Sequence, residues 1–159
     1  MTNALEVTLP DGAPFIDYTR EFDYPAARVF GAHVDPDTYA EWIGPDRLDT
    51  RIDVFDAVPG GSYRFVQTEG TEEYAFRGVF HSIRPAEFIL QTFEYEGFPD
   101  QASLDFLRFE DLPDGRSRLV GHSVYPSLET RDSFVSSGME SGMAAGYDKL
   151  EQLLAFATA

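Results

Sequence analysis

The feature that most constrains the fold is a long amphipathic pattern near the C-terminus, from Ser127 to Ala157. Apolar side chains recur there at intervals of three and four residues, which places them on one face of an α-helix. They are Val135, Met139, Met143, Tyr147, Leu150 and Leu154. Polar side chains lie on the opposite face: Ser137, Glu140, Ser141, Asp148, Glu151 and Gln152. We therefore predict one helix over 127–157 that covers an apolar surface with one side and meets water with the other.

A row of three glycines, Gly138, Gly142 and Gly146, runs beside the apolar stripe. Each glycine inside a helix lowers stability by roughly 1 kcal/mol relative to alanine, so the row needs a structural reason. Either another surface approaches the helix closely there, or the glycines leave room for something else. The row ends before Leu150 and Leu154, which are typical core residues. We predict that the first half of the helix forms the wall or lid of a cavity.

Upstream of this helix, short segments alternate between apolar and polar residues, as β-strands do. After a polar lead-in over residues 1–13, a first strand is predicted over 15–22. Two short helices follow, which start at Asp23-Tyr24-Pro25 and Asp35-Pro36 and end at Gly44-Pro45. Six further strands are predicted between turns rich in glycine, proline and aspartate: 51–55, 63–68, 74–81, 88–95, 102–109 and 118–125.

This order of elements predicts an α+β fold. Strands joined by short turns form an antiparallel sheet, and the long helix is the only predicted element large enough to cover it. The sheet must therefore curve around the C-terminal helix and leave a cavity between them, with the two short helices placed after the first strand. At 159 residues, we expect a single domain over residues 1–159, with its core from about 15 to 157.

Composition argues against several classes of function. The chain carries 28 acidic and 12 basic residues, a net charge of −16, which disfavours binding to nucleic acid or to anionic membrane surfaces. No apolar run is long enough to span a bilayer, and the N-terminus lacks the features of a signal peptide. Cysteine is absent, so disulfides and thiol chemistry are excluded. We expect a cytoplasmic protein.

The sequence shows no motif for catalysis, metal binding or cofactor binding. Its three histidines, His33, His81 and His122, have no metal-ligand spacing, and no Gly-x-Ser-x-Gly nucleophile motif is present. His33 is expected near a helix end, where a positive charge suits the helix dipole, and His81 is expected at the surface. His122 lies in a strand whose facing the sequence leaves ambiguous, so it remains a candidate cavity residue. We expect no catalytic residue, no metal and no cofactor.

Aromatic residues make up 14% of the chain, with 14 phenylalanines and 8 tyrosines, which suits a wide apolar interior. Any one of them is as readily explained by core packing. As a group, they are predicted to face the glycine- and methionine-rich half of the helix, where flexible side chains adapt to a ligand. We predict a site for a small hydrophobic or aromatic molecule, with hydroxyl groups from Tyr63 and Tyr147. Its lining would be Trp42, Tyr63, Phe65, Phe76, Phe80, Phe93, His122, Met139 and Met143.

Several local motifs, in their order along residues 15–157, add a family resemblance. They are Phe22 through Val29, Asp35-Pro36 leading to Trp42 and Gly44-Pro45, Pro59-Gly60-Gly61 with Tyr63 and Phe65, Gly78 followed by Ile83-Arg84-Pro85, Arg131-Asp132, the stretch from Ser137 to Gly142, and Tyr147-Asp148-Lys149-Leu150. In this order the chain resembles the START/Bet v 1-like (SRPBCC) superfamily, and within it the branch named after the activator of heat-shock-protein-90 ATPase. The resemblance implies a helix-grip fold. Ile43 departs from the pattern, because many members carry a second tryptophan there, and this changes the mouth of the pocket.

Three functions of different classes remain open, in decreasing order of preference. The first is a carrier or sensor that binds a small apolar molecule without chemistry. The second is an enzyme acting on such a molecule, for instance a cyclase or dehydratase, with His122 or a cavity tyrosine as general acid or base. The third, implied by the resemblance, is a protein-binding module that acts as a co-chaperone. We expect a small hydrophobic molecule as partner, neither nucleic acid nor membrane, at most a weak homodimer, and a chaperone partner only through the resemblance.

Overall fold

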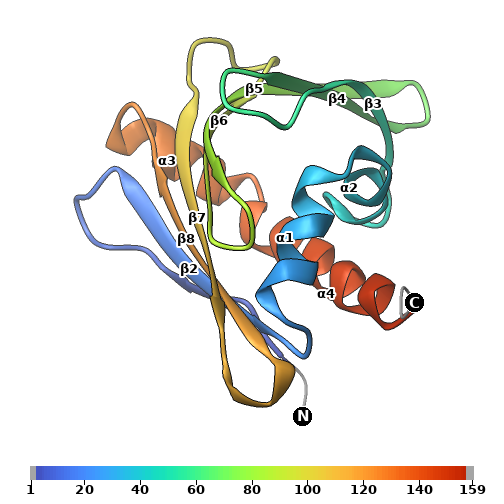
Figure 1. Cartoon of the computed structure of the whole chain (residues 1–159). Coiled ribbons are helices and arrows are strands. Elements are labelled where there is room, and N and C mark those ends of the chain that lie inside the picture. Colours follow the sequence, from blue (N-terminus) through green and yellow to red (C-terminus); the bar gives the residue numbers. More distant parts are fainter. Residues whose placement is uncertain (1–2, 157–159) are drawn as a thin grey trace.

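The computed structural model describes residues 3–156 and contains an antiparallel sheet of eight strands (Figure 1). The strands are β1 (Glu6–Thr8), β2 (Phe15–Phe22), β3 (Asp49–Phe55), β4 (Ser62–Glu69), β5 (Glu72–Arg84), β6 (Phe88–Tyr95), β7 (Ser103–Asp111) and β8 (Ser117–Val124). Their order across the sheet is β1-β2-β8-β7-β6-β5-β4-β3. The helices are α1 (Ala26–Val34), α2 (Pro36–Trp42), α3 (Leu128–Ser136) and α4 (Met139–Phe156), with a 3-10 turn, η1 (Pro113–Gly115).

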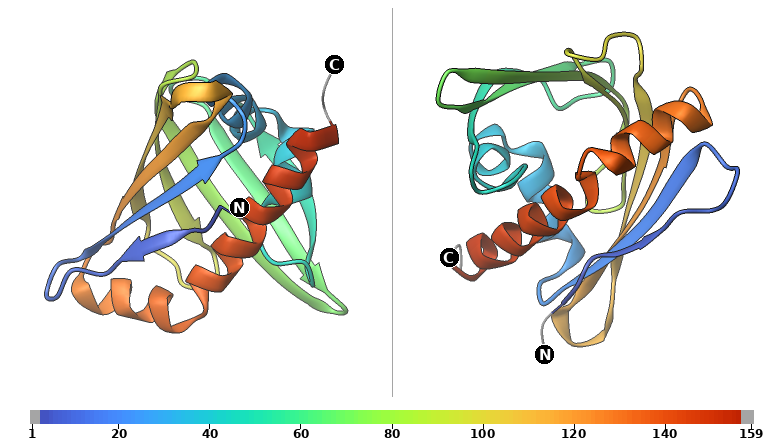
Figure 2. Two further views of the ribbon diagram at one scale, coloured as in Figure 1. Left: turned by 90° about the horizontal axis from the view of Figure 1, so that it is seen from below. Right: turned by 180° about the vertical axis from the view of Figure 1, so that it is seen from behind.

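The sheet bends strongly, so that β3, β4 and β5 form one wing and β2, β7 and β8 the other (Figure 1). The pairing register shifts between Ile52 and Val54 in β3 and between Phe80 and Ser82 in β5, and such irregularities increase the local twist of a strand. Helix α4 crosses the concave side of the sheet (Figure 2), and α1 and α2 both contact it. The predicted α+β architecture, a curved antiparallel sheet around a C-terminal helix, is confirmed.

The alternation of side chains along the strands places the core between the sheet and α4. In β2, every second residue from Ile16 to Phe22 is buried, as the period of two in a strand requires. In β8, the same rule buries Leu119, which has no exposed surface. Leu150 in α4 is also fully buried, and Leu154 is nearly so. The predicted apolar face of the C-terminal helix is therefore the face that meets the sheet.

The predicted single helix over 127–157 is wrong in one respect, because the structure divides it into α3 and α4. The break lies at Ser137 and Gly138, where Gly138 has a φ angle of +89°. That left-handed conformation costs glycine little and is common at helix C-termini. The predicted start is confirmed, since Ser127 caps α3 by accepting a hydrogen bond from the Thr130 N–H at 3.1 Å. The predicted end, Ala157, lies outside the described residues.

Two smaller features of the N-terminal half also differ from the predictions. The predicted lead-in over 1–13 contains β1, which pairs antiparallel with β2. Helix α1 begins after Pro25 without a side-chain cap, so Asp23 does not cap it. In α2 the expected cap is confirmed, because the Asp35 carboxylate accepts hydrogen bonds from the Thr38 N–H and hydroxyl groups.

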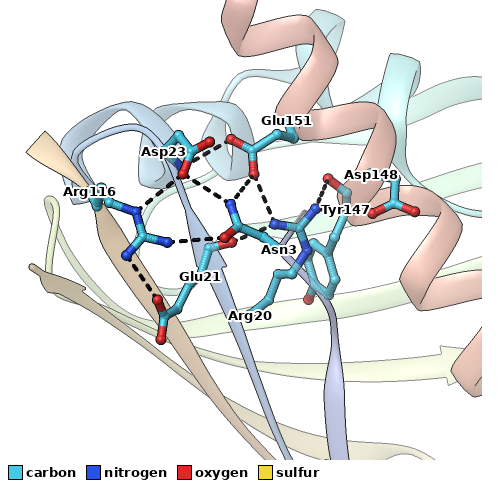
Figure 3. Close-up of polar contacts among 8 residues, drawn as sticks. All are labelled: Asn3, Arg20, Glu21, Asp23, Arg116, Tyr147, Asp148 and Glu151. Atoms are coloured by element: carbon cyan, nitrogen blue, oxygen red, sulfur yellow. Dashed lines mark hydrogen bonds and ion pairs between the residues drawn. The ribbon is translucent and has the colours of Figure 1, made fainter. Parts of the chain in front are cut away.

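A polar network fixes α4 to the start of the sheet (Figure 3). Arg20 of β2 points toward α4, and its guanidinium group contacts Asp148 Oδ1 at 3.0 Å and Glu151 Oε1 at 2.9 Å. Glu151 also accepts hydrogen bonds from the Asn3 side chain at 2.9 Å and from the Asp23 N–H at 3.0 Å. Because the Arg20 side chain is only 2% exposed, these contacts compensate a buried charge. They hold the second half of α4 in place.

Across residues 3–156, no helix combines the length and the apolar character needed to cross a lipid bilayer.

Candidate functional site

Two adjacent chambers, together called the cavity below, lie between the sheet and the first half of α4. The inner chamber has a volume of about 180 Å³, and the outer chamber, toward the surface, has a volume of about 500 Å³. Several residues border both chambers: Trp42, Ile43, Phe93, Phe134, Met139, Met143 and Tyr147. The mouth runs between the segment after α2 and the start of α4. The residues there that line the outer chamber and not the inner one are Gly44, Pro45, Arg47, Leu48, Ser137, Gly138, Ser141 and Gly142. The two chambers are therefore neighbours that share one wall.

Six of the predicted site residues line this cavity: Trp42, Phe65, Phe76, Phe93, Met139 and Met143. Phe65, Phe76 and Phe93 form a group of neighbouring rings, with centroids 5.1–6.5 Å apart. On the opposite side, Trp42 stacks on Tyr147 of α4, with ring centroids 5.7 Å apart. Met139 and Met143 add flexible side chains, which adapt readily to the shape of a neighbour.

The three other predicted site residues do not border the cavity. Phe80 is 2% exposed and packs between Phe55 and Tyr63. The Tyr63 hydroxyl, predicted as a polar group of the site, donates a hydrogen bond to the Thr92 carbonyl oxygen within the sheet. His122 faces outward from β8, where its Nδ1 lies 2.6 Å from Asp17 Oδ1. The expectation that His81 is exposed is confirmed.

The three glycines of the predicted row have three different roles. Gly138 ends α3 through its positive φ angle. At Gly142, an added methyl group would meet only the Pro45 ring, at 3.9 Å, so this position leaves open space at the mouth. At Gly146, a methyl group would lie 2.9 Å from the Trp42 carbonyl oxygen, so this glycine permits close contact between α4 and the end of α2. Both explanations for the row are correct, each at a different residue.

The inner chamber has a polar end, which the sequence analysis did not identify, and Asp105 of β7 is its centre. Asp105 pairs in register with Ser123 of β8 and with Gln91 of β6, and all three line the chamber. The Ser103 hydroxyl donates a hydrogen bond to Asp105 Oδ1 at 2.8 Å, and Ser123 also hydrogen-bonds to the carboxylate. Burial raises the pKa of Asp105 from 3.8 to about 6, and the two serines only partly offset this rise. At neutral pH, the chamber thus holds a carboxylate that is mostly ionised.

Among the described residues, four tyrosines line the same chamber: Tyr18, Tyr39, Tyr125 and Tyr147. Tyr18 of β2 and Tyr147 of α4 hydrogen-bond to each other, and burial raises the pKa of both phenols above the usual range. Gly121 of β8 makes room for the Tyr18 ring, because a methyl group there would overlap the ring carbons at 2.0–2.5 Å. Both tyrosines are neutral at physiological pH and can donate or accept a hydrogen bond.

His33 also lines the inner chamber, as a neutral imidazole. Its Nδ1 lies 2.8 Å from the Val29 carbonyl oxygen, so Nδ1 carries the proton and Nε2 is an acceptor. Burial lowers the pKa of His33 from 6.5 to about 4. The expected position near a helix end is confirmed, but the expected positive charge is wrong, because the ring is buried beside Trp42 and Phe109.

Residues further along β7 indicate which face of the sheet Asp105 lies on. Leu107 and Phe109 of β7 are buried, and residues two apart in a strand share a face, so Asp105 and Ser103 face inward with them. Leu104 and Phe106 are apolar residues on the other face of the same strand. Taken alone, they would indicate that this other face is the inner one. In β8, the buried Leu119 places Ser123 inside and His122 outside by the same rule.

Within the described part of the chain, no group of three or more histidine, cysteine, aspartate or glutamate side chains is arranged to hold a metal ion. The polar end of the cavity thus offers hydrogen bonds and one negative charge.

Solved structures with the same fold come from several bacteria. A crystal structure from Rhodobacter sphaeroides matches with a TM-score of 0.87 at 21% identity, covering 97% of this chain and 100% of the other. A solution structure from Arthrobacter aurescens matches with a TM-score of 0.86 at 20% identity, covering 96% of this chain and 92% of the other. DynU16, a protein of the dynemicin biosynthetic locus, matches with a TM-score of 0.66 at 17% identity, covering 91% of this chain and 48% of DynU16. At these identities the likeness shows the fold alone.

Among proteins with curated descriptions, none matches this sequence significantly. The profile of one protein family does match, over residues 23–155, from the segment before α1 almost to the end of α4. The matched region thus includes the lining of the cavity apart from Ile16 and Tyr18, and the chain belongs to the family described as Activator of Hsp90 ATPase homolog 1-like protein.

Proposed function

We propose that this protein binds a small apolar or aromatic molecule in the cavity between its sheet and α4, as a carrier or sensor. The observation that carries the proposal is the cavity itself. Its outer chamber of about 500 Å³ falls within the size range of small-molecule sites, which are concave and mainly apolar with a few polar groups. A well-filled core would leave few voids larger than a water molecule.

The distribution of aromatic rings supports the same function. Rings from the sheet (Phe65, Phe76, Phe93) and from α2 (Trp42) line the outer chamber, so a flat aromatic ligand would meet aromatic surface from both elements. The segments at the mouth contain glycine at Gly44, Gly138 and Gly142, and glycine lets the main chain approach or separate with little steric cost.

Binding can be measured with N-phenyl-1-naphthylamine, a neutral dye whose fluorescence rises in apolar surroundings. We expect saturable binding of one molecule per chain and displacement by 1-ethylnaphthalene. A matched pair of variants locates the site: Gly142→Leu places a side chain in the mouth, whereas Glu140→Leu adds the same side chain at an exposed position of α4 that does not border the cavity. Only Gly142→Leu should weaken binding. Dye binding that does not saturate, or that both variants affect equally, would contradict the proposal.

An enzyme acting on the bound molecule is the second candidate, and the polar end of the chamber is the observation that favours it. Asp105, with a pKa of about 6, is suited to accept or donate a proton near neutral pH, and the hydroxyls of Tyr18 and Tyr147 lie in the same chamber. Native mass spectrometry of the purified protein separates the two candidates. An enzyme that turns over its substrate should hold, in Asp105→Asn, a molecule whose mass differs from that of the molecule in the wild type by the mass change of the reaction. A carrier should hold either the same molecule in Asp105→Asn or less of it.

A co-chaperone role would involve binding to another protein through an outer surface. It is tested by adding the chain to a bacterial Hsp90 and measuring the rate of ATP hydrolysis, which such a role would increase.

A further inference from the structure

The inner chamber combines an apolar wall with one carboxylate that lacks a cationic partner. Among residues 3–156, Asp105 is the only acidic residue of its lining, and neither lysine nor arginine borders it. Among residues 3–156, the side chains that hydrogen-bond to the Asp105 carboxylate are those of two serines, Ser103 and Ser123. Asp105 is half-buried, and a carboxylate withdrawn from water is disfavoured unless it is paired. The protein therefore holds a negative charge in its ligand cavity without the positive charge that would usually accompany it.

A second polar side chain with an unpaired acceptor, His33, borders the same chamber. His33 is 6% exposed, and its Nε2 atom has no hydrogen-bond partner among the described residues. Because Nδ1 is the protonated nitrogen, facing the Val29 carbonyl oxygen, Nε2 carries a free lone pair. His33 borders the same chamber as Asp105. The Nε2 atom itself has almost no exposed surface, so His33 adds an unpaired acceptor beside the chamber, while Asp105 supplies the charge within it.

We propose that the ligand is a primary amine with an apolar, aromatic body, and that Asp105 binds its protonated amino group inside the inner chamber. The proposal rests on the proposed function, since it specifies which small molecules the same cavity selects. An ammonium group has three N–H donors and loses favourable hydration when it leaves water. The carboxylate of Asp105 would replace that hydration with a charge-assisted hydrogen bond. Gln91, Tyr18 and Tyr147, which line the same chamber, carry oxygen atoms that can accept further hydrogen bonds.

The charge of the whole protein favours a cation over an anion. With a net charge of −16, the protein attracts cations and repels anions at long range. The one arginine at the outer chamber, Arg47, lies 3.7 Å from Glu69 and is mostly exposed, so it does not reverse this preference. A carboxylate ligand would meet Asp105 as a like charge, and a neutral alcohol would gain a weaker hydrogen bond than an ammonium group.

Three probes of nearly equal shape test the proposal by calorimetric titration at pH 7.5: 1-naphthylmethylamine, 1-naphthalenemethanol and 1-naphthoic acid. We expect the amine to bind the wild-type protein at least about tenfold more tightly than the alcohol, as a hydrogen bond between charged groups implies. The acid should bind most weakly. This comparison uses only the wild-type protein, so it does not require that any variant folds.

Two aspartate variants then assign the preference to one residue. In Asp105→Asn, the ratio of amine to alcohol affinity should fall toward one, while the alcohol still binds and thereby shows that the cavity remains formed. The matched control is Asp17→Asn, which removes the same charge from the outer face of β2, where Asp17 contacts His122. The control should keep the wild-type ratio.

The outcomes separate the two proposals. If the amine binds no more tightly than the alcohol, or if Asp105→Asn keeps the wild-type ratio, the recognition of an amine by Asp105 is overturned while alcohol binding still supports a small-molecule site. If Asp17→Asn lowers the ratio as much as Asp105→Asn, the preference arises from the overall charge, and the role of Asp105 is again overturned. If none of the probes binds, the proposed function itself fails.

Discussion

Gly146 of α4 lies directly against the main chain at the end of α2, where a methyl group on Gly146 would come within 2.9 Å of the Trp42 carbonyl oxygen. Real side chains do not approach a main-chain oxygen so closely without displacing it, and α2 holds Trp42 in the wall of the cavity. The position of Trp42 therefore depends on the absence of a side chain at residue 146.

The first prediction is that Gly146→Ala destabilises the protein by about 1–3 kcal/mol, the usual range for overpacking. The matched control is Gly31→Ala inside α1, where an added methyl group meets no atom within 4 Å. That change should raise stability by up to about 1 kcal/mol, because alanine is the better helix former. Urea titrations of both variants measure the difference. Equal effects of the two changes would show that α4 and α2 are not in close contact.

The second prediction concerns the core under the second half of α4. Leu150 has no exposed surface, so Leu150→Ala should lower the free energy of unfolding by about 2–5 kcal/mol, the range for buried leucines. Gln152, two residues further along the same helix, is exposed, and Gln152→Ala should change stability by less than about 0.5 kcal/mol. A loss below about 1 kcal/mol for Leu150→Ala would contradict the observed packing of α4 on the sheet.

The third prediction concerns the network around Arg20 (Figure 3). Glu151→Gln removes the negative charge that contacts Arg20 at 2.9 Å and leaves the guanidinium group with Asp148, whose side chain is 59% exposed. We expect a loss of about 1–3 kcal/mol, the usual effect of weakening a hydrogen bond to a buried charge. Glu41→Gln, at an exposed position of α2, is the control for removing one negative charge and should have little effect. A comparable loss in both variants would mean that Glu151 acts only through the overall charge.

The order of elements could be predicted from the sequence because it depends on local signals. The strands have clear alternation, Asp35 and the proline after it mark the start of α2, and Leu150 and Leu154 mark the buried face of α4. The wall of the cavity could be predicted for a related reason: Trp42, Phe93, Met139 and Met143 lie on faces that periodicity identifies.

The remaining features depend on contacts between distant parts of the chain. Gly138, Gly142 and Gly146 are equivalent in the sequence, and only the neighbours of each one decide whether it ends a helix, leaves space or permits close contact. Strand β1 is three residues long and depends on its pairing with β2. The inward facing of Asp105 was obscured by Leu104 and Phe106, apolar residues on the outer face of β7. The polar end of the cavity was missed for that reason.

The fourth prediction is a pH dependence caused by Asp105. Its pKa is raised from 3.8 to about 6 in the folded protein, so the folded state binds a proton more tightly than the unfolded state. The contribution of Asp105 to stability therefore decreases as the pH rises from about 4 to 6 and is constant above that range. The Asp105→Asn variant has no carboxylate at this position and so does not lose this contribution. The free energy of unfolding of the variant, relative to that of the wild type, should therefore increase between pH 4 and 6 by up to roughly 3 kcal/mol.

His33 titrates in an overlapping range with the opposite sign. Its pKa is lowered from 6.5 to about 4, so its contribution to stability is lost as the pH falls below about 6.5. Because both proteins contain His33, its effect cancels in the difference between Asp105→Asn and the wild type. Urea titrations of both proteins between pH 4 and 8 measure that difference. A constant difference over this range would mean that Asp105 has an ordinary pKa and does not lie in an apolar chamber.

The last prediction is that Gly142→Ala separates stability from binding. The new methyl group would contact only the Pro45 ring, at 3.9 Å, which is an ordinary van der Waals distance, and alanine favours the helix by up to about 1 kcal/mol. Stability in urea should therefore stay the same or increase. The methyl group also narrows the mouth of the outer chamber, which Pro45 and Gly142 both line, so N-phenyl-1-naphthylamine should bind more weakly than to the wild type. A destabilised variant with unchanged dye binding would mean that Gly142 serves close packing, as Gly146 does, and that the dye does not enter the cavity at this mouth.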